Sequence, residues 1–239
     1  MFQTQSGPGL PSSAIFVGPD PITRVVGIGD TVLGTTLTTI GGAVLNDSGQ
    51  ISFVANTSGG PGLVYRATPR PGGYTFEQIK AAGATPSINN AGQVSFIAGA
   101  TPSERIIFVG DGNTLATVAT TGDALGTFSF GDFGSTPVIN NGGAVSFWAR
   151  SDSGQVGIFV GKDGTFTKIA DNIAMGPCAS YGTFTGIGDE GSVIFHCVAS
   201  SPAKPVTKDE CEKGGWKTFT FLRTFKNQGD CIQFVNTGK

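Results

Sequence analysis

The stretch Ile88-Asn89-Asn90-Ala91-Gly92-Gln93-Val94-Ser95-Phe96 decides the fold, because the chain repeats it. The phrase recurs at Leu45–Phe53 and at Ile139–Phe147, and a fourth copy at Ile187–Phe195 keeps the spacing but loses the asparagines. The final phenylalanines of successive copies lie 43, 51 and 48 residues apart. A period of about 40 to 50 residues is typical of propellers, solenoids and other repeat architectures.

A second phrase alternates with the first. It reads Ile15-Phe16-Val17-Gly18 and returns at residues 63–66, 107–110 and 158–161. Because both phrases keep the same register, we divide the chain into four units: residues 14–61, 62–105, 106–156 and 157–201.

Each unit is expected to contain four short antiparallel strands. Asn-Asp or Asn-Asn followed by x-Gly is turn chemistry, so the first phrase predicts a hairpin around its asparagines. The second phrase predicts another hairpin with the apolar segment that follows it. These four partner segments are Ile22–Val26, Phe76–Lys80, Thr114–Ala119 and Phe166–Ala170.

Alternation within the strands indicates sheets that are buried on both faces. In Ile51-Ser52-Phe53-Val54-Ala55, one face carries Ile, Phe and Ala, and the other carries Ser and Val without any charge. A sheet with one hydrated face would alternate apolar with strongly polar residues. The sequence therefore predicts an all-β, β-propeller-like fold of four repeats, with a β-sandwich or a solenoid as the alternative.

Composition restricts the class of protein. Only 13% of residues are charged and the net charge is −2, while 38 glycines and 18 phenylalanines fit many short strands joined by tight turns. Without a basic cluster, nucleic acid is not an expected partner. The sequence has no apolar run long enough for a membrane span. Residues 1–13 show no signal-peptide pattern and resemble residues 53–62, so we interpret them as the remnant of a preceding repeat in a longer protein.

The four cysteines predict two local disulfides. Cys178 and Cys197 both lie in the fourth unit, whereas Cys211 and Cys231 bracket a tail, residues 202–239, that follows a short Ser/Pro-rich linker. Paired cysteines in a glycine-rich chain indicate an oxidising compartment, and closing a loop of about 20 residues stabilises a fold by roughly 3 kcal/mol. The alternative is two buried free thiols in the fourth unit and two incidental ones in the tail.

The tail resembles a segment shared by exported bacterial proteins. Cys211-Glu212-Lys213-Gly214-Gly215-Trp216 and Phe225-Lys226-Asn227-Gln228-Gly229-Asp230-Cys231 are similar to the C-terminal segment of many actinobacterial repeat proteins. The repeats resemble bacterial extracellular propeller-like proteins with an Ile-Asn-x-x-Gly-x-Val-x-Phe phrase. Both resemblances imply secretion or surface display, and neither implies an activity.

No residue combination predicts catalysis. His196 is the single histidine and is expected to be structural, since no Gly-x-Ser-x-Gly elbow accompanies it. The turn chemistry alone accounts for the carboxylates at Asp47, Asp111, Asp163 and Asp189. Calcium could bind at Asp111-Gly112-Asn113 or Asp163-Gly164, although the full calcium-loop pattern is missing.

The remaining candidates are also expected to be structural. Asp30 and Asp123, with Asp171 at a similar place, are predicted to end strands and to accept backbone N–H bonds. Gly27-Ile28-Gly29-Asp30 lacks the lysine and helix of a phosphate loop. The larger aromatic residues share no repeat position, which favours core packing over a sugar-binding platform; they are Trp148, Trp216, Tyr65, Tyr74 and Tyr181.

Two functions remain open from the sequence. The favoured one is a non-catalytic secreted or surface-displayed module that binds a protein or carbohydrate partner through its loops. The alternative is a secreted hydrolase of glycans or esters with its site at a channel mouth. No cofactor is expected beyond the calcium named above.

Overall fold

The computed structural model describes residues 13–18, 22–58, 60–99, 101–134, 136–172, 178–199, 205, 207–219 and 224–238. The chain forms two compact units, residues 1–171 with 182–196 and residues 172–181 with 197–239. The expected remnant at residues 1–13 lies outside the described residues except for Ser13, and so does most of the linker. None of the helices in the described part of the chain is long and apolar enough to cross a bilayer.

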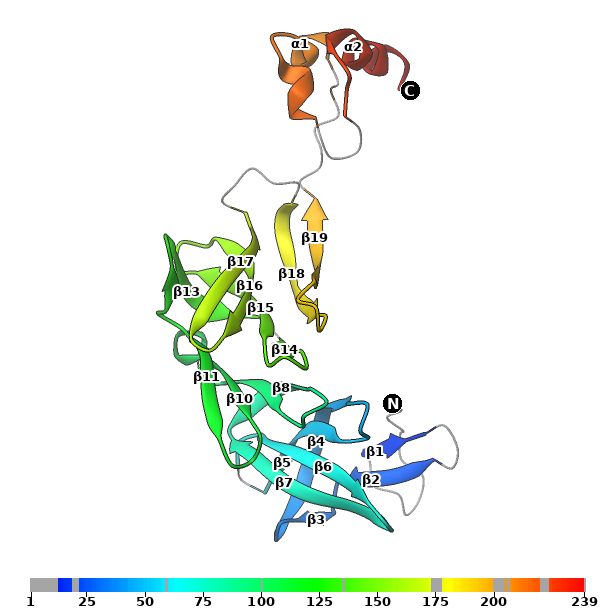
Figure 1. Cartoon of the computed structure of the whole chain (residues 1–239), viewed down its shortest axis with the longest axis vertical. Coiled ribbons are helices and arrows are strands. Elements are labelled where there is room, and N and C mark those ends of the chain that lie inside the picture. The colour runs from blue at the N-terminus through cyan, green and yellow to red at the C-terminus, as the bar shows by residue number, and fades with distance from the viewer. Residues whose placement is uncertain are drawn as a thin grey trace. The chain divides into compact units, whose positions relative to one another are not determined.

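Antiparallel sheets follow one another along the described chain (Figure 1). The N-terminal hairpin pairs β1 (Ala14–Val17) with β2 (Thr23–Gly27). Sheet 1 contains β3 (Thr31–Val32), β4 (Thr35–Leu45), β5 (Ile51–Thr57), β6 (Leu63–Arg70) and β7 (Gly73–Ala81). Sheet 2 contains β8 (Gly83–Ile88), β9 (Val94–Ala98), β10 (Ile106–Gly110) and β11 (Leu115–Thr120).

Sheet 3 and a last strand pair complete the series. Sheet 3 contains β12 (Ala124–Leu125), β13 (Phe128–Phe133), β14 (Val138–Ile139), β15 (Val145–Ser151), β16 (Val156–Lys162) and β17 (Thr165–Asp171). The C-terminal hairpin pairs β18 (Cys178–Ile187) with β19 (Val193–Ala199). Strands that are consecutive in sequence are neighbours in sheets 1 and 2, as expected for up-and-down blades, whereas in sheet 3 both β13 and β14 pair with β15.

The sheets are offset by half a unit from the sequence repeats. In sheet 2, β8 and β9 flank the Asn89 turn, while β10 carries the Ile-Phe-Val-Gly phrase and pairs with β11. Each complete sheet therefore joins the second half of one unit to the first half of the next. The N-terminal hairpin corresponds to the second half of a sheet, and the C-terminal hairpin corresponds to the first half.

The two repeated phrases meet in the middle of each complete sheet. The phenylalanine of the first phrase lies directly opposite the aromatic residue of the second, as Phe53 opposite Tyr65, Phe96 opposite Phe108, and Phe147 opposite Phe159. Their ring centroids are 5.3, 5.7 and 5.8 Å apart. Cross-strand aromatic pairs of this kind stabilise a sheet.

Both faces of the central strands β5, β9 and β15 are dry, as the alternation predicted. Phe53 and Phe96 are fully buried, and on the opposite face so are Ser52, Ser95 and Ser146. One apolar cluster joins sheet 1 to the N-terminal hairpin, a second joins sheets 1 and 2, and a third joins sheets 2 and 3. Sheets stacked face against face in this way make the fold all-β and propeller-like.

The asparagine turns share one internal geometry. In the first three copies, the glycine N–H donates to the carbonyl of the first asparagine at 3.0–3.1 Å. The side chain of that asparagine closes the turn by accepting the N–H four residues later, as Asn89 Oδ1 does from Gln93 at 2.9 Å. The glycine has a positive φ in each, for example +79° at Gly92, a region that side chains disfavour.

These turns also bind one another across the sheets. The side-chain amide of Asn46 donates to the carbonyl of Asn89 at 2.8 Å, Asn89 donates to Asn140 at 3.1 Å, and Asn140 donates to Gly188 at 3.0 Å. We call this series the asparagine ladder. Because its donors are buried and its acceptors are backbone carbonyls, the ladder fixes the placement of each sheet on the next.

A second row of bonds runs beside the ladder. The backbone N–H of Asp47 donates to Asn90 Oδ1 at 3.0 Å, that of Asn90 to Asn141 Oδ1 at 2.7 Å, and that of Asn141 to Asp189 Oδ1 at 2.9 Å. The N–H and side-chain amide of Asn141 hold the pKa of the Asp189 carboxyl below its usual value.

The tail is helical, which the sequence did not predict. It contains α1 (Lys208–Cys211), a 3-10 turn at Gly215–Thr218, and α2 (Gln228–Thr237). Both predicted disulfides are present, Cys178–Cys197 joining β18 to β19 and Cys211–Cys231 joining α1 to α2. Cys211 and Cys231 are fully buried beside Phe225, so the tail disulfide is the centre of a small core.

Candidate functional site

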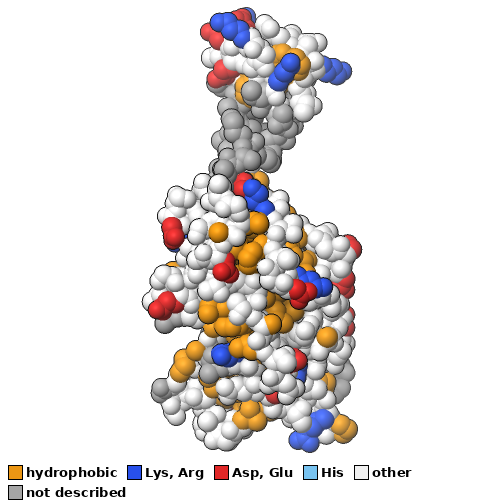
Figure 2. Space-filling model, turned by 60° about the vertical axis from the view of Figure 1, so that its left-hand side comes forward, with side chains coloured by type: hydrophobic (Ala, Val, Ile, Leu, Met, Phe, Trp, Pro, Cys, Tyr) orange, Lys and Arg blue, Asp and Glu red, His pale blue; other side chains and the backbone are white. Residues whose placement is uncertain are grey.

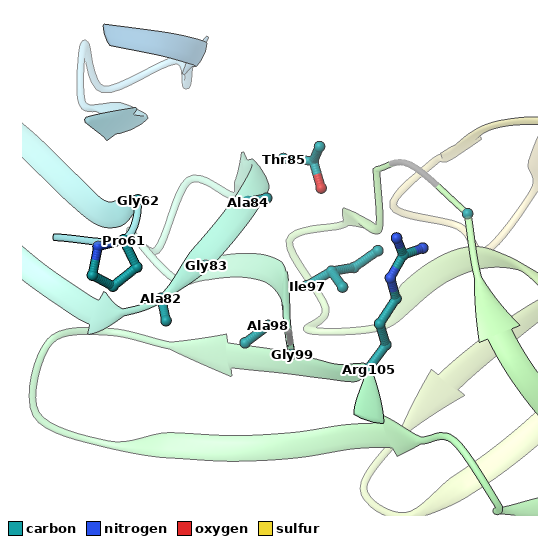
Figure 3. A pocket seen from close by; sticks show the side chains of 11 residues that line it. Pro61, Gly62, Ala82, Gly83, Ala84, Thr85, Ile97, Ala98, Gly99 and Arg105 are labelled. Atoms are coloured by element: carbon teal, nitrogen blue, oxygen red, sulfur yellow. The ribbon is translucent and has the colours of Figure 1, made fainter. Parts of the chain in front are cut away.

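A pocket of about 460 Å³ lies beside Arg105 (Figure 3). Its described walls come from the residues before β6, the start of β8, the end of β9, the residue before β10 and the residue after β13. These are Pro61, Gly62, Ala82, Gly83, Ala84, Thr85, Ile97, Ala98, Gly99, Arg105 and Gly134. The volume is within the range of about 300 to 1,000 Å³ that is usual for small-ligand sites. We call it the Arg105 pocket.

Arg105 is the charged residue among the described walls. It follows the 3-10 turn Pro102–Glu104 and immediately precedes β10. Its guanidinium donates to Asp132 Oδ1 at 2.8 Å and to the carbonyl of Phe133 at 2.7 Å, which ties sheet 2 to β13 of sheet 3. Figure 3 shows the side chain extending past Ile97. The ion pair holds the guanidinium in one orientation, so its remaining donors face a fixed direction.

A second, smaller pocket adjoins the same ion pair. Its volume is about 380 Å³, and its walls include Asp132, Arg150 and Asp152. Asp132 contacts both arginines, Arg105 at 2.8 Å and Arg150 at 3.6 Å, and is 16% exposed. The Arg105–Asp132–Arg150 series therefore contributes residues to both pockets.

The backbone of the Arg105 pocket is locally strained. Ala82 and Thr85 have φ values of +57° and +51°, where residues other than glycine are uncommon. The pairing of β8 with β9 also shifts register between Ala84 and Ser87. Strained backbone of this kind is concentrated at binding sites, where the surrounding structure maintains it.

Packing explains at least one glycine in the pocket wall. A Cβ on Gly83 would lie 2.5 Å from Val64 Cγ2 and 2.8 Å from Phe96 Cδ2. The absence of a side chain at Gly83 is therefore required by the interface between sheets 1 and 2, and it needs no ligand to account for it.

The sequence-predicted carboxylates do not converge. Asp47 and Asp189 belong to the row of bonds beside the asparagine ladder, and Asp163 lies in its own turn. Asp111 Oδ1 accepts the N–H groups of Thr114 and Asn113 at 2.7 and 2.9 Å, and these bonds lower its pKa. Over the described ranges, no group of three or more His, Cys, Asp or Glu residues is placed to hold a metal ion.

Asp30 and Asp123 end strands in the predicted manner. Asp30 Oδ2 accepts the N–H of Gly27 at 2.8 Å, and Asp123 Oδ2 accepts that of Thr120 at 2.8 Å. Burial alone would raise the pKa of Asp30, but the bonds from Arg24 and Gly27 hold it below its usual value. Asp171 is buried and pairs with Lys168.

The histidine and the larger aromatic residues are not among the described walls of the Arg105 pocket, although Trp148 contacts one of those walls, Gly134. His196 is exposed on β19, and its Cβ lies 3.0 Å from the position that a Cβ on Gly182 would take. Tyr65 is buried in sheet 1, whereas Trp148 packs against Gly134. Of the remaining aromatics, Trp216 and Tyr181 belong to the second compact unit and Tyr74 lies on β7.

Sequence reasoning missed Arg105. The residue belongs to neither repeated phrase, and the other walls are small residues from separate segments. The sequence signal that could have drawn attention to Arg105 is its position, directly after Pro102-Ser103-Glu104 and before the third Ile-Phe-Val-Gly strand.

Figure 2 shows how charge is distributed on one face of the molecule. Lysine, arginine and acidic side chains lie singly or in small mixed groups, and hydrophobic side chains gather between them. This face carries no stripe of positive charge of the kind that binds nucleic acid.

Comparison with solved structures identifies propeller proteins. TolB from Acinetobacter baumannii matches with a TM-score of 0.54 at 15% identity, over 83% of this chain and 47% of that chain. A Trypanosoma rangeli sialidase in complex with the inhibitor DANA gives a TM-score of 0.42 at 12% identity, over 78% of this chain and 34% of the sialidase chain. A fucose lectin from Kordia zhangzhouensis in complex with methyl-fucoside gives a TM-score of 0.31 at 20% identity, over 54% of this chain and 96% of the lectin chain.

Of these three, TolB is similar enough to show a shared fold, and this chain spans about half of the TolB chain. At that identity the likeness concerns the fold alone. No protein with curated function matches the sequence. A family of unknown function, DUF7453, matches residues 62–210, and because this is more than half of the sequence, the chain belongs to that family.

Proposed function

We propose that this protein is a non-catalytic, secreted or surface-displayed repeat module that binds a protein or carbohydrate partner at the Arg105 pocket. The observation that carries the proposal is a pocket of small-ligand size with one oriented arginine and otherwise small, mostly apolar walls. Fixed polar groups in an apolar hollow provide orientation and specificity for a ligand.

The described walls of the pocket favour binding over chemistry. They include the hydroxyl of Thr85 and the guanidinium of Arg105, but no carboxylate, imidazole or thiol. General acid–base or nucleophilic catalysis needs such a group within hydrogen-bond reach of the substrate. The Arg105 guanidinium can donate hydrogen bonds to a ligand, but it has no acceptor with which to take a proton.

The second pocket is the observation that favours a hydrolase. It contains two carboxylates, Asp132 and Asp152, and glycosidases act with a pair of such groups. However, both carboxylate oxygens of Asp132 already face arginines, Oδ1 facing Arg105 at 2.8 Å and Oδ2 facing Arg150 at 3.6 Å. The carboxylate is therefore engaged in holding these two side chains.

The test combines binding and turnover. The wild-type protein is applied to a glycan array and to a panel of polysaccharide and ester substrates. Ala84→Leu fills the pocket from an exposed position on β8, and Ala116→Leu is the matched control on β11. We expect array binding that Ala84→Leu weakens at least about tenfold and Ala116→Leu does not, without turnover. Turnover that Asp152→Asn abolishes would instead establish the hydrolase.

Secretion is part of the proposal and has its own test. Two disulfides support an oxidising compartment, because such bonds rarely persist in the cytosol. Thiol labelling of the untreated native protein is expected to find no reactive cysteine. Four reactive thiols would remove this support.

A further inference from the structure

The guanidinium of Arg105 has one nitrogen that is fully engaged and an edge that is open. Its Nη1 donates both of its hydrogen bonds, to Asp132 Oδ1 at 2.8 Å and to the carbonyl of Phe133 at 2.7 Å. Among the described residues, neither Nη2 nor Nε has a hydrogen-bond partner, and the side chain is 35% exposed. Figure 3 shows the guanidinium beside Ile97, which also lines the pocket. The Nε–Nη2 edge is therefore available to a ligand in the Arg105 pocket.

This open edge has the geometry that binds a carboxylate. The guanidinium is planar, and its Nε–H and Nη2–H groups are parallel donors that can pair with the two oxygens of one carboxylate. The described walls of the Arg105 pocket contain no acidic residue that would repel such a ligand. Asp132 and Asp152 line the second pocket instead, and Glu104 Oε2 accepts the hydroxyl of Thr101 at 3.1 Å. A carboxylate is thus the anion that this edge fits.

The other described walls suit an aliphatic group better than a sugar ring. Apart from Arg105, the hydroxyl of Thr85 is their one polar side-chain group, and the remaining walls are glycine, alanine, proline and isoleucine. A sugar would bring several hydroxyl groups against these walls, and polar groups buried without a partner cost free energy. The described walls also contain no aromatic side chain on which a sugar ring could pack. The matching ligand combines a carboxylate with a compact apolar group.

The pocket opens to the surface, so this group can be the end of a longer chain. Ala82 and Ala84 line the pocket and are exposed. In extension of the proposed function, on which this step rests, we propose that the Arg105 pocket binds the free C-terminus of a protein or peptide that ends in an aliphatic residue. The terminal carboxylate pairs with Nε and Nη2 of Arg105, and the last side chain lies against Ile97 and Ala98. Capture of a C-terminal carboxylate is a recurrent mode of peptide recognition.

The first test compares two peptides that differ only in the terminal group. The complete wild-type chain is titrated into the fluorescently labelled peptide Gly-Ser-Gly-Ser-Val, with a free C-terminal carboxylate or with a C-terminal amide, and anisotropy is measured. We expect the free acid to bind with a Kd below about 1 mM and amidation to weaken binding at least about tenfold, because the amide loses the charge-assisted pair. A free-acid peptide that ends in serine is expected to bind more weakly than the one that ends in valine. These comparisons need no variant to fold.

The second test assigns the preference to Arg105. In Arg105→Gln, the affinities for the acid and the amide are expected to converge within about twofold, whereas general damage to the pocket would weaken both peptides alike. Arg24→Gln is the matched control and is expected to keep the preference. Arg24 is 37% exposed and pairs with Asp30 at 2.8 Å, but it is not a wall of the pocket. Ala84→Leu, which fills the pocket, is expected to weaken the free acid at least about tenfold.

Competition distinguishes a peptide terminus from an unattached acid. We expect 3-methylbutanoate, a free acid with an aliphatic body, to displace the labelled peptide at least about tenfold less well than the unlabelled peptide does. Equal displacement would assign the pocket to free acids and overturn the peptide as its ligand. Equal affinity for acid and amide, a preference that survives Arg105→Gln, or no peptide binding up to about 1 mM would also overturn the proposal.

The glycan array separates the failure of this proposal from that of the proposed function. Glycan binding that Ala84→Leu weakens, without any preference for the free-acid peptide, would leave the binding module in place and remove its C-terminal ligand. Absence of both glycan and peptide binding would remove both.

Discussion

Substitution of Asn89 tests whether the asparagine ladder holds the sheets together. The side chain of Asn89 is almost fully buried and makes three hydrogen bonds. It donates to Gln93 Oε1 at 2.9 Å and to the carbonyl of Asn140 at 3.1 Å, and it accepts the N–H of Gln93 at 2.9 Å. Asn89→Ala removes all three bonds and leaves their partners without a replacement.

The expected loss follows from these bonds. A hydrogen bond contributes about 1 kcal/mol net, so Asn89→Ala is expected to lower the free energy of unfolding by about 3 kcal/mol. Asn89→Asp keeps the shape but directs a second carboxylate oxygen at two acceptors, Gln93 Oε1 and the Asn140 carbonyl. Because a buried, unpaired charge costs more than a missing bond, we expect Asn89→Asp to be the more destabilising change.

Urea unfolding followed by tryptophan fluorescence and circular dichroism measures both variants. Asn113→Ala is the control, since Asn113 is exposed and its turn uses its backbone N–H rather than its side chain. The control is expected to change stability by less than about 0.5 kcal/mol. If Asn89→Asp unfolds at the same urea concentration as the wild type, the ladder does not contribute as we have argued.

Three further predictions concern packing, pH and the tail. Gly83→Ala is expected to cost about 1–3 kcal/mol by overpacking against Val64 and Phe96, while Gly41→Ala, with no atom within 4 Å of its Cβ, is expected to be nearly neutral in thermal unfolding. Because the folded protein holds the pKa of Asp189 below its usual value, the ionised carboxylate stabilises the fold at pH values above the ordinary carboxyl pKa. This contribution is lost as the pH falls through the lower pKa of the folded state. The pH dependence of the free energy of unfolding should therefore lack this contribution in Asp189→Asn. Cys211→Ser is expected to unfold the tail helices, with an amide-exchange loss confined to residues 207–238 and no change in the sheets.

The repeated phrases predicted the local structure of the sheets because that structure is local in sequence. Asparagine and glycine at fixed spacing specify the turn, and the apolar alternation specifies which side chains are buried. The four Ile-Phe-Val-Gly hairpins pair as expected, from β1 with β2 to β16 with β17. The asparagine ladder could not be predicted from the sequence. The repeated phrase shows that the asparagine side chain can close its own turn, but it does not show that the side-chain amide also donates to a carbonyl in the turn of the next copy.

The Arg105 pocket and the tail helices escaped prediction for different reasons. The pocket depends on how Pro61, Gly99 and Gly134 converge from separate segments, and no spacing in the sequence encodes that. The helix α2 had local signals: Asn227 caps it by accepting the N–H of Asp230, and Gly238 ends it in the left-handed conformation. These signals were masked by the strand-rich composition of the whole chain.

The offset between sequence units and sheets has a consequence for how such a protein can change length. A boundary such as residue 61/62 falls between β5 and β6, so a gene duplication at that point would insert the second half of one sheet and the first half of the next. The inserted halves would pair with the halves already present, and every strand would keep a neighbour of the type it had before. Copy number can therefore vary during evolution without leaving an incomplete sheet in the interior, and the only halves left unmatched are those at the two ends of the repeat series.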